Sequence, residues 1–330
     1  MISDKLDQLL TGLRAVAEPT RLRLLALCAE HDLTVTELTA ILQQSQPRVS
    51  HHLKLLCDGG LLERFREGSW VFHRLARRNI VAESILAMVP RDDAQLQRDR
   101  ARLDAVMEER AVQAAEYFAH NAAQWDAIRS LHVPEREVER LLLDLVAGHP
   151  VTDLLDIGTG TGRMLEIFAP HVAHATGIDM SRDMLAVARA HLERAGLRNC
   201  TIRQGDMYAL PLAAGSFDLV LLHQVLHFAD KPTEVLAEAA RVLRPGGRLA
   251  VIDFAPHECE QLRSQHAHRR LGFADAEISQ WLARAHLETG QPLRLPGQPL
   301  TVVIWQAAKP QVIPNTAATP ARPLAAGIAQ

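Results

Sequence analysis

The sequence predicts two domains of different fold class, a mainly α-helical domain in the first third of the chain and an α/β domain with a mostly parallel sheet after it. An apolar run at residues 154–157 leads into a loop with three alternate glycines. Two short amphipathic helices and a hairpin are expected over residues 36–75. The 330 residues suit about two domains, and 48% hydrophobic residues are enough for two cores.

The glycine-rich loop is the strongest signal for the α/β domain. The apolar strand carries Asp156, and Gly158, Gly160 and Gly162 follow it, with Asp179 about twenty residues further on. Glycine lets the backbone bend sharply and approach a ligand where a Cβ would collide. The following helix offers unpaired backbone N–H groups, and a carboxylate at 179 can accept both hydroxyls of a ribose. The pattern therefore predicts a nucleotide site.

Further motifs follow in order along the same segment. Asp206 lies in a Gly-Asp-Met sequence, a buried strand is expected over residues 216–222, and residues 243–249 close a helix and open another strand. Residues 151–255 thereby resemble the class I S-adenosylmethionine (SAM)-dependent methyltransferases, in particular the small-molecule group with the quinone-biosynthesis and arsenite methyltransferases. The resemblance implies a Rossmann-like, mostly parallel seven-stranded sheet and SAM or S-adenosylhomocysteine as cofactor.

The resemblance also implies a role for each matching residue. The methionyl part of SAM would lie against the glycine loop, the ribose against Asp179 and the adenine against Asp206 and Met207. His223 and Gln224 would border the methyl group, and His223 or His227 would take any proton that leaves the acceptor. The alternative for the acidic residues is helix capping. The residues implied to hold the cofactor are Asp156, Gly158, Gly160, Gly162, Asp179, Met180, Asp206, Met207, His223 and Gln224.

The N-terminal third contains a helix-turn-helix pattern. Residues 36–42 and 45–56 predict two amphipathic helices with Ser45 as the N-cap of the second, and Leu53 and Leu56 face inward. Strand-like runs at 61–66 and 69–75 predict a hairpin after them. Residues 10–80 resemble the ArsR/SmtB winged-helix repressors, which implies binding to a double-stranded DNA operator. The residues expected to contact DNA are Gln46, Arg48, Ser50, His51, Lys54, Arg64 and Arg66.

Local charge agrees with a DNA-binding surface. Residues 45–78 hold seven Lys or Arg (48, 54, 64, 66, 74, 77 and 78) and three acids (58, 63 and 67), a local charge of plus four, whereas the whole chain is minus three. Neutralising phosphates would make DNA binding salt-sensitive. A solvated helix face without a partner is the alternative.

Metal sensing is not expected. Thr34 and Thr36 stand where many of these repressors have a Cys-x-Cys pair, and hydroxyls are poor ligands for soft metals. The helix expected at residues 79–89 lacks spaced metal ligands, and the adjacent His51 and His52 diverge around their helix. The four cysteines do not match those of arsenite methyltransferases, which disfavours arsenic as the methyl acceptor. The cysteines are Cys28, Cys57, Cys200 and Cys259.

The predicted domains are a winged helix at 1–90, a helical linker at 91–115, a methyltransferase domain at 116–308 and a disordered tail at 309–330. A helix is expected at 134–146 and a final strand at 300–307. Aromatic residues at 117, 118 and 125 would cover the cofactor or pack on the sheet, and His266 and His268 either face the acceptor or lie on a surface helix. The residues expected to form a homodimer interface, or else plain core, are Leu6, Leu9, Leu13, Ile80, Ile85 and Leu86.

Three functions remain open. The favoured one is a transcriptional regulator that couples SAM or S-adenosylhomocysteine binding to operator affinity. The second is an active small-molecule methyltransferase that also controls transcription, and the third is an enzyme whose winged helix serves dimerisation only. We expect no signal peptide and no membrane-spanning stretch, and the scattered cysteines suit a reducing cytoplasm.

Overall fold

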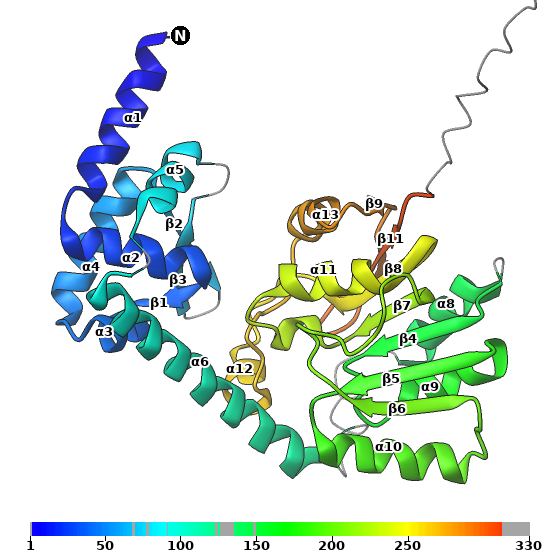
Figure 1. Cartoon of the computed structure of the whole chain (residues 1–330). Coiled ribbons are helices and arrows are strands. Elements are labelled where there is room, and N and C mark those ends of the chain that lie inside the picture. The colour runs from blue at the N-terminus through cyan, green and yellow to red at the C-terminus, as the bar shows by residue number, and fades with distance from the viewer. Residues whose placement is uncertain are drawn as a thin grey trace, which may run out of the picture.

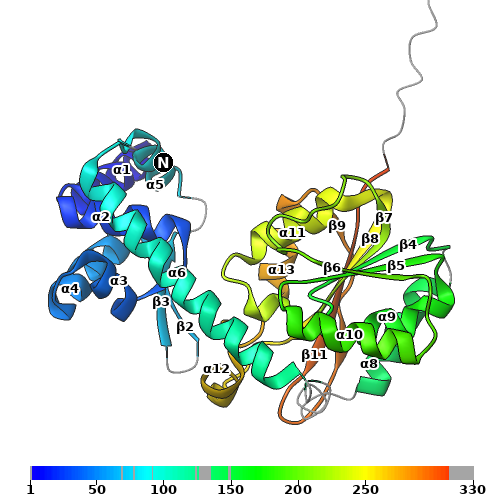
Figure 2. The same cartoon turned by 60° about the horizontal axis from the view of Figure 1, so that its bottom comes forward.

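The computed structural model describes residues 2–67, 70–76, 79–90, 92–122, 125, 135–147 and 150–311. A mainly helical N-terminal domain and an α/β domain lie side by side, and the long helix α6 runs from one to the other (Figures 1 and 2). Both predicted fold classes are therefore confirmed. No helix in the described part of the chain is both long and apolar enough to cross a bilayer.

The N-terminal domain has the predicted winged helix-turn-helix order. Antiparallel strands pair in the order β1-β3-β2. The hairpin of β2 and β3, called the wing below, therefore pairs through β3 with the short strand β1 that precedes the helix-turn-helix. The core includes Leu38, Val49, Leu53 and Leu56, which places the apolar side of both predicted helices inward. Its elements are α1 (Ile2–Val16), α2 (Pro19–Glu30), β1 (Leu33–Thr34), α3 (Val35–Leu42), α4 (Gln46–Asp58), β2 (Leu62–Glu67), β3 (Trp70–Leu75) and α5 (Ile80–Met88).

The first turns of α3 and α4 are capped differently. α3 begins with a capping box, in which Thr34 and Glu37 satisfy each other's backbone N–H groups. Ser45 is the N-cap of α4, as predicted, and its carbonyl accepts from the Val49 N–H, although its side chain makes no capping hydrogen bond. The turn between the two helices contains Gln43 with φ +53°, a conformation that glycine adopts more easily.

The C-terminal domain is built on one sheet with the strand order β10-β11-β8-β7-β4-β5-β6. Strands β4 to β8 are parallel and β10 and β11 antiparallel, so the predicted seven strands are present; the two-residue β9 also pairs with β11 and makes eight. The strands are β4 (Asp153–Ile157), β5 (His174–Asp179), β6 (Cys200–Gln204), β7 (Phe217–His223), β8 (Leu243–Phe254), β9 (Glu288–Thr289), β10 (Leu293–Leu295) and β11 (Val302–Ala308).

Helices cover both faces of this sheet, as an α/β fold with parallel strands requires. One core contains side chains of α11 and α13, and the other contains side chains of α8, α9, α10 and α12. The two sets lie on opposite sides of the strands in Figure 2. The helices are α8 (Glu135–Ala147), α9 (Arg163–Phe168), α10 (Arg182–Arg194), α11 (Pro232–Val242), α12 (Glu260–His266) and α13 (Asp275–Arg284), with 3-10 turns at Ala169–His171 and Leu226–Phe228.

Helix α6 (Ala94–Asn121) connects the domains and is longer than the predicted linker. Its 28 residues span about 42 Å at 1.5 Å per residue. Near its start, Leu103 is 1% exposed in the winged-helix core and Asp99 accepts two hydrogen bonds from Arg23 of α2. The helix continues through residue 115, so Tyr117 and Phe118 belong to it and not to a separate aromatic segment.

The wing packs one face against the α/β domain. Phe65 and Phe72 stack at 5.5 Å, and the guanidinium of Arg263 on α12 lies 5.0 Å from the ring centre of Trp70. Arg74 pairs with Glu63 at 2.6 Å and with Glu277 of α13 at 3.4 Å. Arg74, which adds to the predicted basic patch, is therefore engaged between the domains.

Candidate functional site

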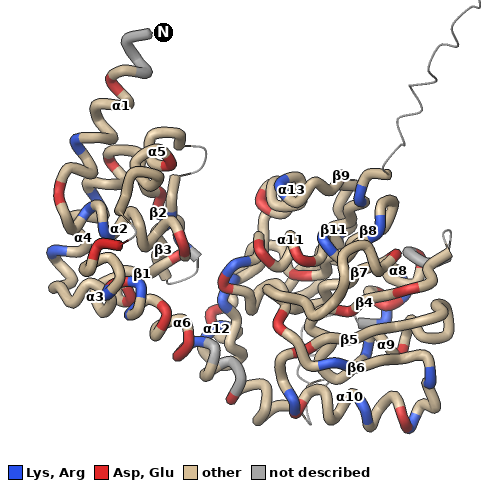
Figure 3. The backbone as a smooth tube through the Cα atoms, viewed as in Figure 1, with Lys and Arg blue, Asp and Glu red and all other residues tan. Residues whose placement is uncertain are grey.

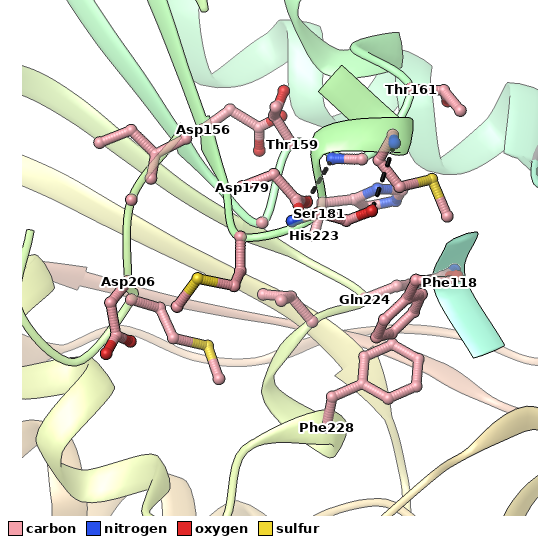
Figure 4. A pocket seen from close by; sticks show the side chains of 18 of the residues that line it. Phe118, Asp156, Thr159, Thr161, Asp179, Ser181, Asp206, His223, Gln224 and Phe228 are labelled. Atoms are coloured by element: carbon pink, nitrogen blue, oxygen red, sulfur yellow. Dashed lines mark hydrogen bonds between the residues drawn. The ribbon is translucent and has the colours of Figure 1, made fainter. Parts of the chain in front are cut away.

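A pocket of about 260 Å³ lies beyond the carboxyl ends of the parallel strands, where α/β folds bind their ligands (Figure 4). It collects nearly all residues predicted to hold the cofactor: Asp156, Gly158, Gly160, Asp179, Met180, Asp206, Met207, His223 and Gln224 line it. Two predicted residues, Gly162 and His227, do not line it.

Asp179 at the end of β5 hydrogen-bonds both to the glycine loop and to the N-cap residue of α10. One carboxylate oxygen accepts from the Gly160 backbone N–H at 2.9 Å and the other from the Ser181 N–H at 2.8 Å. Each oxygen has a second lone pair, so the group can still accept two hydroxyls. Burial raises the pKa of Asp179, and the hydrogen bonds from Ser181 and Gly160 oppose that shift.

The three glycines have three different reasons to lack a side chain, and all have positive φ. A Cβ at Gly158 would lie 2.3 Å from Val225, so this glycine serves close packing. At Gly162, the N-cap of α9, a Cβ would lie 3.1 Å from the Cβ of Ala188. At Gly160 the nearest atom is Nε1 of Trp125 at 3.5 Å, so only Gly160 leaves open space toward the pocket.

The Thr159 hydroxyl and the Gln224 amide nitrogen are buried on the pocket wall and have no hydrogen-bond partner among the described residues. Gln224 also has φ +52°, which costs a non-glycine residue on the order of 1–3 kcal/mol and typically marks functional sites. Unpaired buried donors and acceptors fit a polar ligand, and with the acidic side chains and Gly160 they match the donor and acceptor needs of SAM.

Aromatic rings close the other side of the pocket. Phe118 of α6 and Phe228 meet edge to face at 4.8 Å (Figure 4). The ring of Trp125 lies 5.4 Å from that of Phe118. All three line the pocket, which supports the predicted covering role of Phe118 and Trp125. Tyr117 does not line it and hydrogen-bonds Nδ1 of His266 at 2.7 Å instead. An aromatic wall excludes water from the reacting centre.

The predicted histidines separate into two environments. His223 is 9% exposed and lines the pocket. His227 is 2% exposed, is joined through Nδ1 to Asp253 at 2.8 Å and stacks on His268 at 3.8 Å. His268 is itself buried, so it does not belong to a surface helix, and burial and the neighbouring His227 lower its pKa.

Several residues that line the pocket were not predicted from the sequence. The hydroxyl oxygen of Tyr208 accepts a hydrogen bond from the backbone N–H of Asp230 at 2.8 Å. Nε of Arg269 lies 3.7 Å from the carboxylate of Asp230. Burial raises the pKa of Tyr208 to about 12, so the phenol is neutral and keeps its proton. Tyr208 stands two residues after Asp206 and could have been proposed from that proximity, whereas Asp230 and Arg269 meet only through the fold.

The predicted DNA-binding residues lie on the surface of the winged helix. Arg48, Ser50, His51 and Lys54 are exposed on α4, and basic positions occur along this helix in Figure 3. Gln46, Arg64 and Arg66 are exposed too. Arg64 and Arg66 alternate along β2 with Phe65, which faces the α/β domain. Arg77 and Arg78 lie outside the described residues.

Profiles of two families match separate parts of the chain. The methyltransferase domain profile matches residues 155–251, and that of the bacterial regulatory proteins of the arsR family matches residues 18–64. A chain from the complex of the Haloferax volcanii Trm112 methyltransferase activator with a methyltransferase has a TM-score of 0.52 at 19% identity, over 61% of this chain and 99% of that one, which shows the fold.

Curated relatives agree with the profiles. A ubiquinone biosynthesis O-methyltransferase of Aromatoleum aromaticum is 31% identical over 56% of this chain and 86% of its own length. A 37.1 kDa protein of transposon TN4556 from Streptomyces fradiae is 32% identical over 58% of this chain and 56% of its own length. An arsenite methyltransferase of Aquipseudomonas alcaligenes is 40% identical over 30% of this chain and 32% of its own length. The chain thus spans about half, or less, of the latter two proteins.

The chain belongs to the class I SAM-dependent methyltransferases. Within that class it carries an ArsR-family helix-turn-helix domain ahead of the methyltransferase domain. SAM is the cofactor of this class, and the pocket has the residues to hold it.

Proposed function

We propose that this protein is a transcriptional regulator that binds operator DNA through its winged helix and couples that binding to SAM or S-adenosylhomocysteine in the methyltransferase pocket. The main support is helix α6. It packs Leu103 into the winged-helix core and places Phe118, about four turns later, on the wall of the pocket. A ligand that contacts Phe118 therefore touches an element that both domains share.

The experiment is a binding titration with labelled duplex DNA from the region upstream of the chain's own gene. The apparent affinity of the full-length protein is measured alone, with SAM and with S-adenosylhomocysteine. We expect at least one ligand to change the DNA affinity, and by linkage the duplex changes the affinity for that ligand by the same factor. Equal affinity under all three conditions would refute the coupling.

We further propose that the domain transfers methyl groups to a small molecule, since the chain belongs to a class of methyltransferases and its pocket retains the cofactor residues. SAM supplies an activated methyl group when bound. The protein then has to align the acceptor, exclude water and, where needed, accept a proton. We assign proton acceptance to His223, because His227 is bound to Asp253 and does not line the pocket. Transfer of label from SAM into a metabolite extract tests turnover, and the absence of any labelled product contradicts it.

A homodimer is the third part of the proposal. Leu6, Leu9 and Leu13 of α1 are between 39% and 55% exposed, and Ile80 on α5 is 77% exposed. Such a row of apolar side chains is unusual on a solvated helix and fits a second copy of the chain. Ile85, predicted for the same interface, is 6% exposed and belongs to the winged-helix core.

A further inference from the structure

One arginine on helix α6 bonds to both domains at once. Nε of Arg110 donates to Oε1 of Glu37 on α3 at 2.9 Å, and its Nη1 donates to Oδ1 of Asp230 in the methyltransferase domain at 3.0 Å. The Arg110 side chain is only 13% exposed. A guanidinium is planar and rigid, so a shift of one carboxylate changes the geometry of the bond to the other. Reduced exposure also makes these pairs stronger than those on an open surface.

The Asp230 end of this arrangement belongs to the cofactor pocket. Asp230 lines the pocket, and its backbone N–H donates to the hydroxyl of Tyr208, which also lines it. Tyr208 in turn donates its own backbone N–H to the carboxylate of Asp206 at 2.9 Å. A ligand bound against Asp206 and Tyr208 therefore acts on the segment that positions Asp230.

The Glu37 end belongs to the helix-turn-helix. While one oxygen of Glu37 accepts from Arg110, the other accepts the backbone N–H of Thr34 at 2.8 Å and its hydroxyl at 2.9 Å. The bond from the Thr34 N–H and the reciprocal bond from the Glu37 N–H to the Thr34 hydroxyl oxygen form the capping box that starts α3, the helix packed beside α4. Displacement of Glu37 thus acts on the start of the helix that supports the DNA-contacting helix.

We propose that Arg110 is the coupling residue between the cofactor pocket and the helix-turn-helix. This inference rests on the coupling of ligand and DNA binding proposed above, and it names the contact that transmits it. Occupation of the pocket moves Asp230 relative to Arg110, and the Arg110–Glu37 pair passes the change to α3. The physical requirement is a contiguous set of contacts whose arrangement both sites bias.

Two substitutions test this assignment against a matched control. Arg110→Gln removes the charge that joins the domains. Glu37→Gln weakens the pair from the other side but keeps a side chain that capping boxes accept. The control is Arg102→Gln on the same helix, because Arg102 donates to the Ile41 carbonyl and the Gln43 side chain and pairs with Asp99, which are described residues on the winged-helix side.

Each full-length variant is titrated with the upstream duplex, with and without S-adenosylhomocysteine, and calorimetry gives its affinity for that ligand. Coupling typically changes affinity on the order of 5- to 150-fold, and we expect it to fall to about twofold or less in both test variants but to persist in Arg102→Gln. In the absence of DNA, hydrogen exchange at the first turn of α3 should respond to the ligand in the wild type and the control only.

The outcomes separate the two proposals. If the wild type binds the ligand and the duplex without coupling, the proposed regulatory function fails and the role of Arg110 fails with it. If the wild type is coupled and Arg110→Gln and Glu37→Gln are coupled to the same extent, only the assignment of Arg110 is overturned. Loss of coupling in the two test variants, with the control unchanged and ligand affinity retained, supports it.

Discussion

Replacing Gly160 with alanine tests whether the open space above the glycine loop is where the cofactor lies. Among the described residues, the added Cβ would meet only Trp125, at 3.5 Å from Nε1 and 3.7 Å from Cδ1, which is ordinary van der Waals contact. The substitution therefore costs stability only through the backbone, since φ is +52° and a left-handed conformation costs a non-glycine residue about 1–2 kcal/mol.

The effect on binding should be separate from this effect on stability. A methyl group at residue 160 would occupy space that a ligand against the loop backbone needs. Overpacking of a close-fitting contact costs about 1–3 kcal/mol, which corresponds to a loss of affinity of about 5- to 150-fold. Gly160→Ala should therefore bind S-adenosylhomocysteine more weakly by that factor while the protein stays folded.

Gly196→Ala is the matched control, because Gly196 has φ +68°, no atom of the described part of the chain within 4 Å of its added Cβ and no place on the pocket wall. Urea unfolding followed by circular dichroism should show a similar loss of stability for both variants. Calorimetry with S-adenosylhomocysteine should show weaker binding for Gly160→Ala alone. An affinity of Gly160→Ala equal to that of Gly196→Ala would refute the placement of the cofactor against this loop.

Three further predictions concern charge, pH and assembly. Arg48→Ala should reduce the slope of log affinity for duplex DNA against log salt concentration by about 1. Arg74→Ala should leave this slope unchanged, because the Arg74 side chain is engaged with Glu63 and Glu277. Equal slopes in both variants would contradict the proposed DNA-binding surface. The affinity for S-adenosylhomocysteine should fall as the pH drops toward the raised pKa of Asp179, because only the ionised carboxylate accepts from two backbone N–H groups and two hydroxyls. Calorimetry across a range of pH should show this fall in the wild type. An equally strong pH dependence in Asp179→Asn would contradict the prediction. Leu9→Glu should convert a dimer into a monomer in sedimentation experiments, and a wild type that is already monomeric excludes the interface.

The α/β domain could be predicted well because its signals are local. A buried strand, three glycines and an acidic residue at the end of the next strand follow one another within a short segment, and parallel strands place their carboxyl ends at one edge. Nine of the ten residues predicted to hold the cofactor therefore meet in one pocket, and Gly162 is the exception. Asp230 and Arg269 could not be predicted, because neither belongs to a local pattern and each reaches the pocket through the tertiary fold.

The wing shows a second limit of sequence analysis. A basic hairpin was evident from Arg64, Arg66 and Arg74, but which face each side chain takes depends on the strand register. Arg74 pairs across the hairpin with Glu63 and lies with Phe65 on the face turned toward the methyltransferase domain, whereas Arg64 and Arg66 project from the other face. The same hairpin can therefore contact the methyltransferase domain while keeping two arginines exposed for DNA.

The continuity of α6 decides how far the two domains can act independently. A flexible linker would let the pocket fill without any effect on the winged helix, since its residues would absorb the movement. Here one helix has Asp99 bound to Arg23 at its start, Arg110 bound to both domains near its middle and Phe118 on the pocket wall toward its end. The backbone hydrogen bonds of a regular helix resist sharp bending, so a displacement at Phe118 is transmitted along α6 more readily than along a flexible linker. We therefore expect it to act at the domain contacts, where Arg110 and the packed face of the wing lie.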